Sequence, residues 1–107
     1  MNKLSEDQKN AVLFMQLILT FQGAAMQQMG KIKNPLTDKI ERDLTQAAIS
    51  IDMLDMIKQK TAGNLTKEEQ QLIDHILSEL KLNYVDELDR EKKEKGKEGK
   101  DENKKKE

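Results

Sequence analysis

The longest uncharged stretch of the chain places the strongest constraint on its fold. It runs from Asn10 to Gly30, holds 21 residues and lies between Lys9 and Lys31, in a protein in which 36% of the residues are charged. On a helix with 100° per residue, two broad apolar faces leave one narrow strip of polar and small residues. A helix that is apolar on most sides is buried on most sides. We therefore expect the rest of the chain to cover this segment.

The strip consists of Gln16, Thr20, Gly23 and Gln27, whose spacing of four, three and four residues keeps them on one line along the helix. Two interpretations remain open: a solvated seam, or a polar line that faces its symmetry mate, with amides pairing across the interface. Gly23 and Ala24 lack bulk, so a second helix can approach closely there. Because exposed apolar surface of this size marks an interface, we predict a homo-oligomer, most simply a dimer with these helices in contact near Gly23.

A membrane span is the alternative for this segment, since 21 residues at 1.5 Å each span about 31 Å. Against it, glutamine amides without partners cost several kcal/mol each in lipid, and the uninterrupted apolar run Ala11–Met15 is short. The first nine residues also lack the basic start of a signal peptide. We expect a cytoplasmic protein without a membrane span, and membrane association through this helix stays an alternative function.

Composition narrows the function further. The chain has no cysteine, which removes disulfides and thiolate chemistry. Residues 1–89 carry 10 Lys/Arg and 14 Asp/Glu, a net charge of −4, whereas residues 90–107 carry 9 and 6, a net charge of +3. Because phosphate contacts dominate nucleic-acid affinity, the mildly acidic body predicts no nucleic-acid partner. Weak anion or nucleic-acid binding through the basic tail, with Lys104, Lys105 and Lys106, stays a further alternative.

Capping boxes and turn residues divide the chain into three helices. In a capping box a hydroxyl or carboxylate at the N-cap pairs with a Glu or Gln three residues later. The boxes pair Ser5 with Gln8, Asp38 with Glu41, and Thr66 with Glu69. Gly30 is expected to end the first helix, and Pro35 marks a turn before the second helix. Gly63 is expected at positive φ in the turn before the third helix. The predicted helices are residues 6–29, 38–60 and 67–88.

Apolar spacing predicts how these helices pack. The second helix has a heptad stripe and a weaker second apolar face, so it needs neighbours on two sides. The third helix has one wide stripe, which is typical of an outer layer. The stripe of the second helix is Ile40, Leu44, Ala47, Ile51 and Leu54, and its second face is Ile49, Met53 and Met56. We predict an all-α, three-helix antiparallel bundle over residues 1–89 with the first helix central. Residues 90–107 have no apolar side chain and are expected to form a disordered Lys/Glu tail.

Three segments together are similar to the domain of unknown function 1844 family of bacteria. They are Ile51 to Leu54, Lys60 to Glu69, and Leu80 to Val85, and Gly30 and Pro35 match two further marks of that family. The resemblance implies a small helical bacterial domain with no assigned activity. It also implies a structural role for the turn residues Gly63, Asn64, Thr66 and Glu69.

Asp52 and Asp55 are the acids that border the stripe of the second helix. A partly buried carboxylate pair could serve as acid and base, because desolvation raises one pKa into a useful range. The alternative is that these acids bond to the neighbouring backbone or to a lysine and so set the register of the bundle. No base or nucleophile accompanies them in the sequence, which favours the alternative.

The remaining motifs predict no phosphate-binding loop and no metal site. The segment Lys60–Asn64 lacks the glycines of a phosphate-binding Walker loop, although the amides at the start of the third helix could take an anion. His75 and Glu79 share a helix face, but a metal site needs further ligands. The methionine pairs are Met26 with Met29 and Met53 with Met56, and methionines commonly fill gaps in a core. We expect no metal, no cofactor and no enzymatic activity, but a self-associating interaction or scaffold protein. A different protein partner also stays open.

Overall fold

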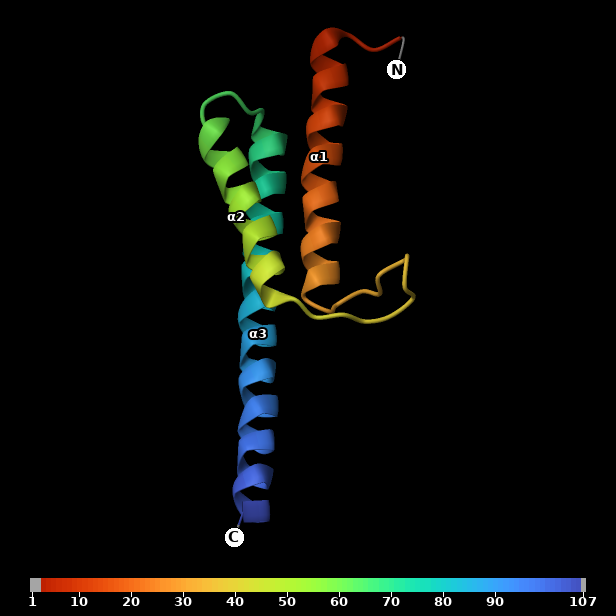
Figure 1. The fold of residues 1–107 in the computed structure, drawn as a ribbon. Helices are drawn as coiled ribbons and strands as arrows, with labels where there is room; N and C mark the ends of the chain where they lie inside the picture. The colour runs from red at the N-terminus through yellow and green to blue at the C-terminus, as the bar shows by residue number, and fades with distance from the viewer. Residues whose placement is uncertain (1–2, 107) are drawn as a thin grey trace.

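The computed structural model describes the backbone of residues 3–106 and the side chains of residues 3–96 as three helices (Figure 1). Helix α1 is Glu6–Gln28, α2 is Leu44–Lys60 and α3 is Lys67–Lys106. Helices α1 and α3 run in the same direction and α2 runs opposite to both. Within the described residues there is no strand, only an isolated bridge between Asn34 and Lys39. The predicted all-α antiparallel bundle is confirmed.

Both ends of α1 form as the sequence predicts. The Gln8 N–H donates to Ser5 Oγ at 3.2 Å, and the Ser5 N–H donates to the Gln8 side chain at 3.0 Å. Gly30 has φ +80°, its N–H donates to the Gln27 carbonyl, and the Lys31 N–H donates to the Met26 carbonyl. These two bonds are a Schellman motif, which needs a residue without a Cβ penalty at positive φ.

The predicted start of the second helix at Asp38 is wrong. Helix α2 begins at Leu44, and its N-cap is Asp43, whose carboxylate accepts the Gln46 N–H at 3.1 Å. The Asp43 N–H also donates to the carbonyl of Gln28, the last residue of α1, at 2.7 Å. This contact joins the start of α2 to the end of α1, so the helix starts where tertiary packing holds its cap.

Residues 31–43 form a loop in place of the predicted first turns of that helix. The Asn34 side chain accepts the Leu36 N–H at 2.9 Å, and the Asp38 N–H donates to the Asn34 carbonyl at 2.7 Å. Asp38 has φ +57°, a left-handed conformation that Asp tolerates but a helix does not. Ile40 is therefore 56% exposed and does not join the buried stripe.

Helix α3 begins as predicted but does not end at Leu88. The capping box is present, since the Thr66 N–H donates to Glu69 Oε1 at 2.8 Å and the Glu69 N–H donates to Thr66 Oγ1 at 3.1 Å. The helix continues to Lys106, so the predicted disorder is wrong for residues 90–96. The side chains of the basic cluster at 104–106 lie outside the described residues.

Local charge pairs account for the helical conformation beyond the bundle. Lys93 lies 3.1 Å from Asp89 and Lys95 lies 3.0 Å from Glu91, both at i, i+4 spacing. Each such pair stabilises a helix by about 0.2–0.5 kcal/mol. Composition alone did not predict this continuation of α3. A segment without apolar residues can still be helical when opposite charges recur every four residues.

The core draws on all three helices, and α1 is not at its centre. Helix α1 buries only Ile18 and Ala25, and every helix contacts both others. Helix α3, which the sequence predicted as an outer layer, supplies more of the core than α1 does. The buried apolar side chains are Ile18, Ala25, Met29, Leu44, Ala47, Ile51, Leu54, Ile73, Ile76, Leu77 and Leu80. One side of α1 is consequently left without a neighbour among the described residues.

Candidate interaction surface

The predicted polar strip lies on the side of α1 that faces away from the other helices. Ile18 and Ala25 mark the buried side, and α2 and α3 both lie on that side of α1 (Figure 1). The strip stands about 180° around the helix from Ile18. Gln16 and Thr20 are exposed, and Gly23 and Gln27 are half-buried. The structure therefore places all four predicted strip residues on one open surface.

Large apolar side chains flank the strip on both sides, and we call the strip and its two flanks the outer face of α1. Five of these side chains are between 36% and 49% exposed, although they belong to the most apolar segment of the chain. One flank is Leu13, Leu17 and Ala24, and the other is Val12, Met15 and Leu19. Contiguous exposed apolar surface of this kind marks a site of interaction.

Gly23 lies on the outer face, where no other described element packs against it. Outside the backbone of its own helix, a Cβ placed there would find no atom of the described residues within 4 Å, so no other described element approaches this glycine closely. Glycine in the interior of a helix costs about 1 kcal/mol relative to alanine. The close approach that a missing side chain permits is therefore unused in the isolated chain.

A second exposed stripe runs along α2. Ile49, Met53 and Met56 recur at spacings of four and three residues and are 41–48% exposed. They lie opposite the buried side of α2 that carries Ala47 and Leu54. The sequence indicated two apolar faces on this helix, and within the part of the chain that the structure describes only one of them packs against a neighbour.

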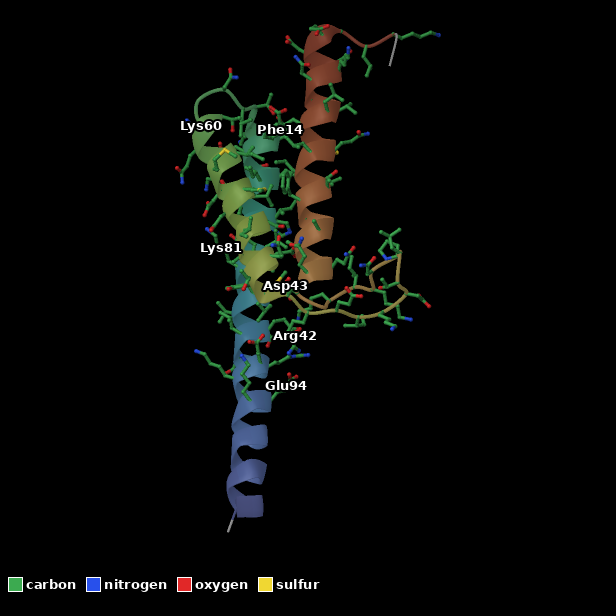
Figure 2. The ribbon with its side chains drawn as sticks, in the orientation of Figure 1. Phe14, Arg42, Asp43, Lys60, Lys81 and Glu94 are labelled. Carbon is green, nitrogen blue, oxygen red and sulfur yellow. The ribbon has the colours of Figure 1, made fainter. Side chains whose placement is uncertain are left out.

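The two acids on α2 have different surroundings. The Asp55 carboxylate lies 3.1 Å from Lys81 Nζ on α3, and Asp52 is exposed. The position of Lys81 beside α2 is visible in Figure 2. The Asp55–Lys81 contact is an ion pair between neighbouring helices. It is the kind of contact expected if these acids bond to a lysine and set the register of the bundle.

The residues of the family-like turn shape the connection between α2 and α3. Gly63 has φ +81°, and the Asn64 N–H donates to the Thr61 carbonyl at 2.9 Å. The amide of Glu69 is already bonded to Thr66, and Glu68 and Glu69 place two carboxylates in the first turn of α3. An anion at this helix end would meet like charge, so the geometry disfavours the anion site that the sequence left open.

His75 and Glu79 come together as expected from their spacing, with His75 Nε2 at 3.5 Å from Glu79 Oε1, and both are exposed. No group of three or more His, Asp or Glu side chains in the described part of the chain is placed to hold a metal ion.

Among the described residues, no helix combines the length and the apolar character needed to cross a membrane.

Sequence reasoning missed a buried ionic cluster around Glu87. This side chain on α3 is only 3% exposed, and it lies 3.3 Å from Lys31 Nζ and 3.3 Å from Arg42. Its Oε2 accepts no hydrogen bond, so the Arg42 contact is ionic rather than well aligned. The sequence does contain an indication of this cluster. Glu87 lies seven residues after Leu80, on the line of the apolar stripe, and a charged side chain buried there needs partners of opposite charge.

Two further contacts extend the cluster to both ends of the 31–43 loop. Lys31 Nζ lies 3.0 Å from Asp86, and Arg42 makes contacts of 2.9 and 3.4 Å with Glu94. Figure 2 shows Arg42 beside Glu94 of α3. The hydrogen bond with Asp86 raises the pKa of Lys31, and the same bond lowers the pKa of Asp86. The cluster therefore braces the loop against α3.

A family model described as a domain of unknown function (DUF1844) matches residues 11–86. The matched segment includes most of α1, all of α2 and α3 as far as Asp86. This match confirms the resemblance seen in the sequence. Neither the curated proteins nor the solved structures include a match to the chain.

Proposed function

Since the chain belongs to the DUF1844 family, whose description carries no activity, we propose from the structure that it is a non-enzymatic interaction protein that self-associates through the outer face of α1. The observation that carries the proposal is the open outer face, on which five large apolar side chains are 36–49% exposed beside a polar strip. A second copy of the chain is the partner that this surface fits best.

The strip is complementary to itself in an antiparallel pairing. When two copies of α1 cross between Thr20 and Gly23, each Gln16 lies opposite the partner's Gln27 and each Thr20 lies opposite the partner's Gly23. Every glutamine amide offers donors and an acceptor to the amide it meets. The small residues fall at the centre, where the helices come closest. A two-fold interface requires this kind of self-matching surface.

The apolar flanks supply a driving force of suitable size. Full burial of a large aliphatic side chain is worth about 1.5–3 kcal/mol, so a side chain that is about 40% exposed retains about 1 kcal/mol. In this pairing the partner's α1 reaches Met15, Leu17 and Leu19, and these three side chains on each copy contribute about 6 kcal/mol to a dimer. Association itself costs about 4–15 kcal/mol. Contact through α1 alone therefore supports a weak dimer, and a tighter one requires apolar surface from elsewhere in the chain.

The first test is the solution mass by light scattering across a dilution series without detergent. The wild-type chain is expected to shift from dimer to monomer on dilution. Leu17→Glu places a charge on the outer face and is expected to give the monomer at every concentration. Leu82→Glu is the matched control, because Leu82 is a 74% exposed leucine on α3, and it should dilute like the wild type.

Two results would contradict the proposal. A wild-type chain that stays monomeric at all concentrations would mean that the outer face serves another partner or none. A Leu17→Glu variant that associates as tightly as the wild type would place the contact away from α1. Circular dichroism of each variant checks that the three helices are retained.

A further inference from the structure

We infer that the loop of residues 31–42 is an arm that packs on α1 of a second copy and covers the N-terminal end of its outer face. The inference rests on the self-association proposed above and names a second surface that completes it. The loop exposes three large aliphatic side chains: Ile32 is 46% exposed, Ile40 is 56% exposed and Leu36 is 93% exposed. In Figure 1 the loop extends past α1 on the side away from α2 and α3.

The arm is held in place at both ends. Lys31 bonds to Asp86 and contacts Glu87, and Arg42 contacts Glu87 and bonds to Glu94, so four ionic contacts tie the loop to α3. Inside the loop, the Asn34 bonds described above fix the turn. A surface loop that is braced while it exposes apolar side chains loses little conformational entropy when it meets a partner.

The geometry of the antiparallel pair shows what the arm would contact. With the crossing between Thr20 and Gly23, the partner's α1 ends with its Gln28 opposite Met15. Val12 and Leu13 lie beyond that point, and they are 36% and 44% exposed. The partner's α1 cannot cover them, but the partner's loop begins opposite Val12. Each copy therefore presents an apolar arm at the position where the outer face of the other copy lacks cover.

Two-fold symmetry makes the arrangement reciprocal. One arm lies at each end of the paired α1 helices, so both arms bind in the same dimer and neither arm is left for a third copy. The arm also provides the additional apolar surface that the contact through α1 alone lacks. The occupant of this surface is thus a second copy of the chain, because the loop and the uncovered end of α1 match in both register and chemistry.

Cysteine cross-linking tests the contact directly, because the natural chain has no cysteine. Leu36→Cys and Leu13→Cys chains are mixed at a concentration at which the wild type is dimeric, oxidised, and analysed by mass spectrometry for the 36–13 disulfide. A disulfide between the two variants is expected. The control mixes Leu36→Cys with Leu82→Cys, and equal cross-linking in that mixture would overturn the inference.

A second measurement guards against a geometry that is close but unsuited to a disulfide. Leu36→Ser should weaken self-association about tenfold, because one buried leucine is worth at least that much. Leu82→Ser, at an exposed leucine outside the arm, should leave the association unchanged. A dimer that is unaffected by Leu36→Ser, without the 36–13 disulfide, overturns the role of the arm and leaves the contact through α1 intact.

Two other outcomes separate this inference from the proposed function. A wild-type chain that is monomeric throughout the dilution series refutes self-association, and the arm with it. Binding of the wild type to anionic phosphatidylserine vesicles that Leu36→Ser abolishes, while the dilution curve stays unchanged, would make the arm a lipid contact and overturn its assignment to a second copy.

Discussion

Replacing Gly23 by alanine or by leucine should change the stability of the folded chain and its self-association in opposite directions. Outside the backbone of its own helix, a Cβ at this position meets no atom of the described residues within 4 Å, so the folded monomer has room for alanine, and a leucine side chain begins in open space. Removing a glycine from a helix interior then raises the free energy of unfolding by about 1 kcal/mol for alanine and slightly less for leucine. The gain appears in the monomer because no contact opposes it.

The effect on the dimer has the opposite sign. If two α1 helices approach closely at Gly23, a leucine side chain from each copy must fit into an occupied contact. Overpacking a close contact costs about 1–3 kcal/mol per added side chain, so Gly23→Leu in both copies weakens the dimer by about 2 kcal/mol or more. That loss corresponds to an association constant lower by about 30-fold. Alanine should fall between glycine and leucine.

The assay combines two measurements on each variant. Urea unfolding followed by circular dichroism, at a concentration below the dissociation midpoint, reports the stability of the monomer. Light scattering across the dilution series reports the association. Gly96→Ala is the matched control, because Gly96 is also helical with nothing within 4 Å of an added Cβ, but it lies on α3 beyond the bundle. Gly96→Ala should leave the association unchanged. An unchanged association constant for Gly23→Leu would refute close approach at this glycine.

Two other substitutions test the local structure. Asp43→Ala removes the N-cap of α2 and should lower the free energy of unfolding by about 1 kcal/mol. Asp43→Ser keeps a capping oxygen and should retain most of that stability. Equal losses for the two variants in urea unfolding would mean that the cap contributes nothing. The pKa of Asp86 is lowered chiefly by its hydrogen bond from Lys31, so the ionised form stabilises the fold. That contribution is complete above the unfolded pKa of 3.8 and is lost as pH falls through the lower folded pKa. Between about pH 5 and pH 2, the free energy of unfolding should therefore fall less for Asp86→Asn than for the wild type. Identical plots of this free energy against pH for the two chains would contradict the prediction.

Local features could be predicted because their partners are near in sequence. The capping boxes at Ser5 and Thr66 are satisfied by residues three positions later, and Gly30 and Gly63 take positive φ as helix-closing residues do. The same local rule could not choose between Asp38 and Asp43, since both have a suitable partner three residues on. The contact between the Asp43 N–H and the Gln28 carbonyl, across the end of α1, decided between them.

The self-association surface was partly predictable for a related reason. The period of a helix determines which residues share a face, so the strip of Gln16, Thr20, Gly23 and Gln27 follows from spacing alone. The exposed arm did not follow, because the sequence placed Ile40 in the buried stripe of the second helix and did not indicate that Leu36 would be exposed. Their exposure depends on the loop that Asn34 and the left-handed Asp38 form instead.

Local patterns in the sequence specify three helices, most of their ends, and the alignment of polar and small residues on α1. These depend on backbone hydrogen bonding and on a periodicity that each segment carries within itself. The apolar side of α1 that becomes buried depends on how the three helices pack, because a helix that is apolar on most sides offers several equivalent faces to its neighbours. Packing against α2 and α3 selected the side of Ile18 and Ala25, and Glu87 became buried once the loop brought Lys31 and Arg42 to it. Such choices depend on contacts between residues far apart in the chain, which spacing within one segment does not encode.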